Sequence, residues 1–109
     1  DHLAHGDEIV MRFERWTREN LRRFAMEDAA RAVGASQRTL QRRIRRVLGR
    51  TPIAYVQDVR VERAVHLLQT TDESLDHIAE AVGYHDGVTL RSLLRRKTGR
   101  SVRELRRSS

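Results

Sequence analysis

The sequence contains one short pattern twice, and this repetition restricts the possible folds more than any other feature. Residues 30–34 read ARAVG, and residues 79–83 read AEAVG, 49 positions later. A second match has an offset of 50 and relates residues 44–50, IRRVLGR, to residues 94–100, LRRKTGR. The chain is therefore expected to contain two copies of one supersecondary unit, and the second copy has one extra residue in its turn.

Each copy has the composition of two helices joined by a tight turn. Ala30 and Ala79 are small where two helices must cross closely, and Gly34 and Gly83 let the backbone reverse in a left-handed conformation. A longer, arginine-rich helix follows the turn in both copies. This order predicts two helix-turn-helix units.

The remaining sequence is also predicted to be helical. Pro52 is the only proline, and no stretch alternates apolar and polar residues as a strand does. The predicted fold class is all-α, with two helix-turn-helix subdomains joined by a long linker helix. It has about seven helices, over residues 8–20, 26–33, 37–48, 52–70, 75–82, 87–98 and a last segment holding Val102 and Leu105. Expected N-caps are Asp7, Ser36, Ser74 and Asp86, and expected C-terminal stops are Gly34, Gly49, Gly83 and Gly99.

Charge is concentrated in two blocks. The formal net charge is +7, and 21 of the 22 basic residues are Arg. Residues 21–50 and residues 87–109 each sum to +7, whereas residues 71–86 sum to −5. One such block is as readily explained by a solvated helix face, but two matched blocks favour a polyanionic partner. The excess of Arg favours planar, bidentate recognition.

Several classes of function are excluded by what the sequence lacks. There is no cysteine, and the longest stretch without Asp, Glu, Lys or Arg has eight residues, 64–71. Membrane spans, thiol nucleophiles and cysteine-ligated metals are therefore not expected. No catalytic constellation is apparent, so no enzyme, cofactor or metal site is predicted. His2, His5, His77 and His85 lack a supporting acid cluster, and His66 is expected on a helix surface. We expect a soluble, cytoplasmic, nucleoid-associated module, excised from a longer protein because the initiator Met is missing.

The aromatic residues argue against single-strand binding. They stand at core spacing and do not form a base-stacking platform; they are Phe13, Trp16, Phe24, Tyr55 and Tyr84.

From about residue 7 to residue 107, the sequence resembles the DNA-binding domain of the AraC/XylS family of bacterial transcription regulators. The resemblance is carried by residues 36–42 (SQRTLQR), Arg63-Ala64 with Leu67-Leu68, Ile78-Ala79 with residues 82–84 (VGY), and residues 98–101 (TGRS). It implies that two helix-turn-helix units, held rigidly by the connecting helix, read successive major grooves on one face of double-stranded DNA.

The resemblance also implies an organisation beyond this domain. It implies RNA polymerase as a partner, a missing N-terminal effector or dimerisation domain, and an isolated domain that is monomeric. Residues 5–8, HGDE, are similar to a subgroup whose N-terminal part is an amidase-like, class I glutamine-amidotransferase-type domain. The whole of residues 1–109 is then one DNA-binding domain. Its parts are a first unit at 7–50, a linker helix at 51–70, a second unit at 71–107 and a tail at 108–109.

The second unit departs from the family pattern. Where the family has an aromatic-x-Arg-x-aromatic sequence, this chain has Leu90, Ser92 and Leu94 at the three fixed positions. Arg91 stands one residue earlier, about 100° round the helix, and Val102 replaces a proline near the last helix. The two leucines can still pack, but Ser92 is too short to read bases as an arginine does.

The predicted DNA contacts follow from which side chains face outward on the longer helix of each unit. In the first unit, Leu40 and Ile44 face inward, and in the second unit Gly87 is expected on the outward face with the readers. The predicted base-reading residues are Arg38, Gln41, Arg42, Val88, Thr89 and Ser92; for Arg38 and Arg42 a phosphate contact is the alternative. The predicted phosphate contacts are Gln37, Arg43, Arg45, Arg46, Arg50, Arg91, Arg95, Arg96 and Arg100.

Three functions remain distinguishable. The favoured prediction is sequence-specific binding of double-stranded DNA, since a connecting helix of about 27 Å can hold two readers near one DNA turn of about 34 Å. The alternative is a nonspecific nucleic-acid-binding architectural module, which the Arg content alone would permit. An enzyme is disfavoured because DNA-repair methyltransferases fused to such domains need a cysteine that this chain lacks.

Overall fold

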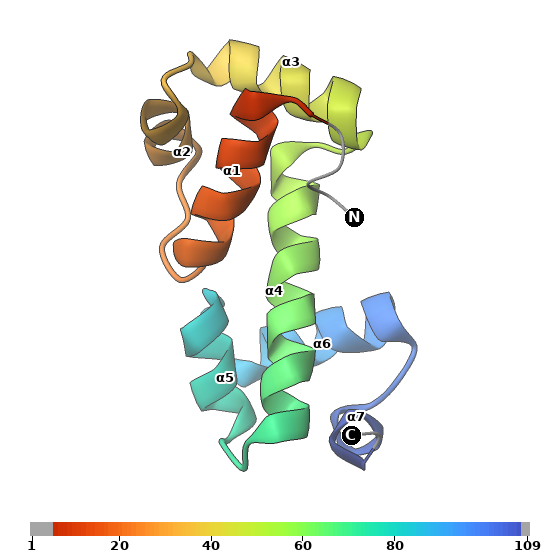
Figure 1. The fold of residues 1–109 in the computed structure, drawn as a ribbon. Helices are drawn as coiled ribbons and strands as arrows, with labels where there is room; N and C mark the ends of the chain where they lie inside the picture. Colours follow the sequence, from red (N-terminus) through yellow and green to blue (C-terminus); the bar gives the residue numbers. More distant parts are fainter. Residues whose placement is uncertain (1–5, 108–109) are drawn as a thin grey trace. The chain divides into compact units, whose positions relative to one another are not determined.

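The computed structural model describes residues 6–107, which form seven α-helices (Figure 1). Their bounds are α1 Glu8–Glu19, α2 Met26–Val33, α3 Gln37–Leu48, α4 Pro52–Thr70, α5 Leu75–Val82, α6 Gly87–Thr98 and α7 Val102–Arg107. The all-α prediction is confirmed, and five helices have the predicted bounds, whereas α1 ends one residue earlier than predicted and the last helix was predicted without bounds. The helices form two compact units, divided inside α4 between Gln57 and Asp58.

The first unit is built on an aromatic and aliphatic core. Figure 1 shows α2 and α3 packed against α1, and the first turns of α4 complete the unit. Phe13 of α1 is fully buried, and its ring centroid lies 5.6 Å from that of Tyr55 and 6.2 Å from that of Phe24. Leu40 and Ile44 form the inner face of α3, and both side chains are fully buried. The aromatic side chains of this unit therefore serve packing.

The second unit has a mainly aliphatic core. The later turns of α4 meet α5, α6 and α7 around one cluster of buried side chains. Ala64, Ile78 and Leu90 are fully buried there, and Leu94 belongs to the same cluster. Tyr84 is half-buried, and the guanidinium of Arg60 lies 5.2 Å from its ring centroid. Burial raises the pKa of the Tyr84 phenol, and the Arg60 charge opposes this effect.

Local hydrogen bonds explain why the helix ends could be predicted. All four expected N-caps accept a bond from the backbone N–H three residues later. The turn after α2 spans residues 34–36 and the turn after α5 spans residues 83–86, so the extra residue does lie in the second turn. Gly34 and Gly83 both begin these turns with positive φ, +73° and +102°. The cap distances are 3.0 Å at Asp7, 3.1 Å at Ser36, 3.1 Å at Ser74 and 2.9 Å at Asp86.

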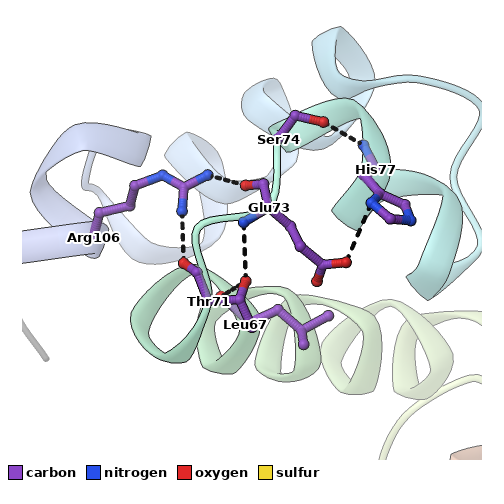
Figure 2. A network of polar contacts seen from close by, with 6 residues as sticks. All are labelled: Leu67, Thr71, Glu73, Ser74, His77 and Arg106. Atoms are coloured by element: carbon purple, nitrogen blue, oxygen red, sulfur yellow. Dashed lines mark hydrogen bonds and ion pairs between the residues drawn. The ribbon is translucent and has the colours of Figure 1, made fainter.

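The C-terminal end of α4 is held by a side chain from α7 (Figure 2). The Arg106 guanidinium donates to the carbonyl oxygens of Thr71, at 3.2 Å, and Glu73. The Thr71 hydroxyl donates to the Leu67 carbonyl at 2.7 Å. Arg106 also donates to the Leu68 carbonyl at 3.5 Å, which is one of the last four carbonyls of α4 and so has no partner within the helix.

Candidate nucleic-acid interface

Helix α3 presents the predicted base-reading side chains on its outer face. The side chains of Arg38, Gln41 and Arg42 are exposed, whereas Leu40 and Ile44 are buried on the opposite face. Ser36 caps the helix and Gly49 ends it in a left-handed conformation, φ +68°. The predicted outward orientation is confirmed, and contact with DNA stays a prediction.

A groove runs along one flank of α3. Its volume is about 580 Å³. One side is polar and basic, and the other is apolar, with Ile53 57% exposed. Thr51 caps the start of α4 beside it by accepting the Ala54 N–H at 3.1 Å. The groove is lined by Met26, Gln37, Arg38, Gln41, Arg42, Arg45, Thr51, Pro52 and Ile53.

The other flank of α3 meets the start of α1. Arg43 Nε lies 3.4 Å from Asp7 Oδ2, and Arg46 Nη2 lies 4.0 Å from the same oxygen. Arg43 is only 35% exposed, compared with 66% for Arg46. Two residues predicted to contact phosphate are therefore next to a carboxylate, and sequence reasoning missed that neighbour because Asp7 lies far away along the chain.

Helix α6 presents few side chains that could reach a base. Val88 is 73% exposed, and Thr89 and Ser92 are exposed beside it, as predicted. The Asp86 carboxylate accepts the Thr89 N–H, and this bond, with a contribution from the Thr89 side chain, lowers the pKa of Asp86 below its ordinary value. The second unit therefore offers a methyl-bearing and hydroxyl-bearing surface.

The expected outward position of Gly87 is wrong. Gly87 is buried against α5, where its N–H donates to Asp76 Oδ1 at 2.7 Å. A Cβ at this position would lie 2.5 Å from Asp76 Oδ1 and 3.2 Å from the Asp76 backbone nitrogen. The first residue of α6 is thus a packing contact between the two helices of the unit, and it leaves the outward face to Val88, Thr89 and Ser92.

Some basic residues of the second unit form ion pairs with acidic side chains. Arg91, Arg96 and Arg100 are exposed. Arg95 pairs with Glu104 at 3.5 Å, and Lys97 pairs with Asp58 at 3.4 Å. In the first unit, Arg50 is exposed after the end of α3. Surface pairs of this kind contribute little to stability, so an arginine in one can exchange its partner for a phosphate.

Three of the histidines, His66, His77 and His85, lie within the described residues. His66 and His85 are exposed. His77 is in the first turn of α5, and its Nδ1 lies 3.2 Å from Oε1 of Glu73, which precedes the helix (Figure 2). His2 and His5 lie outside the described residues. Across residues 6–107 there is no group of three His, Asp or Glu residues able to hold a metal ion. The same part of the chain contains no helix long and apolar enough to cross a bilayer.

Comparison with known proteins identifies the family of this chain. The family described as "Helix-turn-helix domain" matches residues 29–108. A solved AraC-type regulator from Chromobacterium violaceum is 30% identical, with a TM-score of 0.85 over 90% of this chain and 88% of that one. The DNA-binding domain of AdpA, solved in complex with a target DNA, is 33% identical, with a TM-score of 0.80 over 93% of this chain and 91% of that one. The chain belongs to the AraC-type family of helix-turn-helix DNA-binding domains. This AraC-type domain is thus a sequence-specific DNA-binding part of a transcription regulator and not an enzyme.

Relatives of known description are longer than this AraC-type domain. The transcriptional activator RhaS of Enterobacter sp. (strain 638) is 32% identical over 105 residues, which are 95% of this chain and 38% of that protein. RhaS of Escherichia fergusonii is 41% identical over 71 residues, 65% of this chain and 26% of that protein. The AraC-type domain therefore spans about a quarter to two fifths of these relatives.

Proposed function

We propose that α3 and α6 are the recognition helices and that they enter successive major grooves of double-stranded DNA. The observation that carries this proposal is the common exposure of Arg38, Gln41 and Arg42 on one face of α3. Arg side chains of this kind bind guanine O6 and N7, and Gln binds adenine N6 and N7. In the second unit Val88 and Thr89 are proposed to contact thymine methyl groups, and Ser92 to form short hydroxyl bonds.

The phosphate backbone is proposed to be bound by polar and basic side chains around both readers. Contacts with phosphate fix the register of a protein on DNA but do not read its sequence. The exposed positions of most of these residues support the proposal. They are Gln37, Arg45, Arg50, Arg91, Arg95, Arg96 and Arg100, with Arg43 and Arg46 as weaker contacts because both neighbour the Asp7 carboxylate.

Binding-site selection on random duplexes tests which side chains contact bases and which contact phosphates. The Arg42→Ala variant should lose about 1–3 kcal/mol and relax the preference at one base position. The matched Arg45→Ala variant removes the same charge from the same helix, and it should weaken all sequences alike and reduce the salt slope by about one. Two variants with identical base preferences would contradict the assignment. A wild-type selection without an enriched motif would favour the nonspecific architectural module.

Salt dependence tests the two-unit docking. If about six to ten basic residues neutralise phosphates, affinity should fall by roughly 10³–10⁵ between about 50 and 200 mM salt. A slope that corresponds to one or two released ions would contradict docking through both units.

The wider protein is proposed to be a bacterial, cytoplasmic activator that contacts RNA polymerase. The names of the RhaS relatives support activation, and their greater length supports an additional effector or dimerisation domain. The amidase-like type of that domain rests on the resemblance of residues 5–8, of which His5 lies outside the described residues. The isolated domain is proposed to be a monomer, and sedimentation of the chain with and without DNA tests this state.

A further inference from the structure

Asp7 uses both of its carboxylate oxygens, each toward a different helix. Oδ1 accepts the Val10 N–H at 3.0 Å and so caps α1, while Oδ2 lies 3.4 Å from Arg43 Nε and 4.0 Å from Arg46 Nη2. The Asp7 side chain is only 11% exposed. Capping needs one oxygen, and Asn, Ser or Thr at this position would supply it equally well. The second oxygen, which is not needed for the cap, instead places negative charge beside Arg43 and Arg46 of α3.

The charge of Asp7 acts on one flank of α3. Successive residues are about 100° apart round a helix, so Arg43 and Arg46 lie on the side of Arg42 that is turned away from the groove lined by Arg38 and Arg45. A helix in a major groove has a phosphate strand on each side. One flank of α3 thus offers exposed arginines to DNA, and the other offers arginines that already neighbour a carboxylate.

We infer that Asp7 limits the affinity of the domain for DNA of any sequence, because it withholds Arg43, and in part Arg46, from the phosphate backbone. Contacts with phosphate raise affinity for every sequence alike. A carboxylate that competes with phosphate for Arg43 lowers this common affinity and leaves the base contacts of Arg38, Gln41 and Arg42 unchanged. Asp7 thereby lowers the affinity for every sequence by the same factor and leaves the ratio of specific to nonspecific binding unchanged. The inference rests on the proposed role of α3 as a recognition helix.

The test compares Asp7→Asn with Glu8→Gln in the complete 109-residue chain. Both variants remove one negative charge at neighbouring positions, and Asn keeps an oxygen for the cap. Glu8 pairs with Arg12 of its own helix at 3.2 Å and not with α3. Affinity is measured for a duplex carrying the selected motif and for a scrambled duplex of the same composition, at several salt concentrations.

Asp7→Asn should bind both duplexes more tightly than Glu8→Gln does, and by the same factor. One added phosphate contact should steepen its salt slope by about 0.9, or about 3.5-fold in affinity between about 50 and 200 mM salt. Arg43→Ala should have little effect in the wild-type background and should cancel the gain in the Asp7→Asn background. This double-mutant cycle separates withholding from a purely structural role, which would leave the salt slope unchanged.

Three results would overturn the inference. Equal slopes and equal scrambled-duplex affinities for Asp7→Asn and Glu8→Gln would do so. Weaker binding of both duplexes, with a lower melting temperature, would show that Asp7 only holds the helices in place. An equal loss on Arg43→Ala in both backgrounds would show that Arg43 binds DNA despite Asp7. A wild-type chain without preference between the two duplexes would instead contradict the proposed function itself.

Discussion

Single residues decide how closely the two helices of the second unit approach. Gly87 is the first residue of α6, and its N–H donates a hydrogen bond to the Asp76 carboxylate. There is no space for a side chain at this position. The corresponding position of the first unit, Gln37, is exposed and carries a long polar side chain. The two units share a sequence pattern, but the first residue of α6 is a buried packing contact and the first residue of α3 is exposed.

Gly87→Ala should destabilise the protein by about 1–3 kcal/mol, because overpacking a close contact forces the backbone or neighbouring side chains to shift. Denaturant unfolding followed by circular dichroism measures the loss. Adding Asp76→Ala should recover part of it, since the contact at 2.5 Å involves the Asp76 carboxylate. Val88→Ala, at the exposed next position, is the control. If Gly87→Ala were as stable as that control, the close approach would not restrict this site.

The burial of Gly87 could not be predicted from the repeat. Local sequence shows that a helix starts after Asp86, but which helix packs over its first residue depends on the crossing of α5 and α6. The contact of Asp7 with Arg43 was likewise unpredictable, because 36 residues separate the two positions. Both contacts depend on tertiary structure, which a local pattern does not encode.

At the scale of elements, most helix ends were predictable because they carry a local signal. Ser36 and Ser74 bond the backbone three residues later, and Gly34 and Gly83 stop the preceding helices. The start of α2 has no such signal, since Ala25 makes no side-chain cap. Its predicted start still agrees with the structure, so the apolar spacing of the helix was sufficient there.

Helices α3 and α6 have chemically different caps, Ser36 and Asp86, and we expect their stabilities to respond differently to acid. The pKa of Asp86 is lowered from its ordinary value of 3.8. Its stabilising contribution is therefore complete above about pH 4 and is lost as the pH falls through the lower, folded-state pKa. Asp86→Ser retains a capping oxygen that does not titrate, so this variant should lose less stability than the wild type during acidification.

Thermal melting followed from about pH 5 downward measures this difference. Ser36→Asp is the matched reverse exchange on α3, and it should increase the loss of stability in acid. Parallel curves for the wild type and Asp86→Ser would show that the cap carboxylate contributes nothing measurable.

At the scale of the whole molecule, the two units have basic blocks of equal charge but present different exposed side chains. Residues 21–50 and 87–109 both sum to +7, yet the outer face of α3 carries Arg38, Gln41 and Arg42 where α6 carries Val88, Thr89 and Ser92. The charge blocks favoured a polyanionic partner, the repeat predicted two helix-turn-helix units, and helix periodicity predicted the outward side chains except at Gly87. Which bases they prefer depends on the fit to DNA, and neither the sequence nor the free domain contains that information.

The difference between the faces predicts an asymmetric binding site. One half of the selected motif should be well defined, and the other half, about one helical turn away, should be degenerate. Ser92→Arg should sharpen the degenerate half, because an arginine at this exposed position can form bidentate bonds with guanine. Ser92→Lys, with the same charge but no planar fork, is the control. Equal information in both halves of the wild-type motif would mean that α6 reads bases by other residues.

The attachment of Arg106 to the end of α4 has a dynamic consequence. Helices α2, α3, α5 and α6 each end at a glycine in their own backbone, but the residues after α4 are bonded by a guanidinium from a different helix. Fraying of the last turn of α4 is therefore linked to the undocking of α7. Amide hydrogens at the two places should exchange with solvent as one cooperative opening event, and not as two independent helix ends.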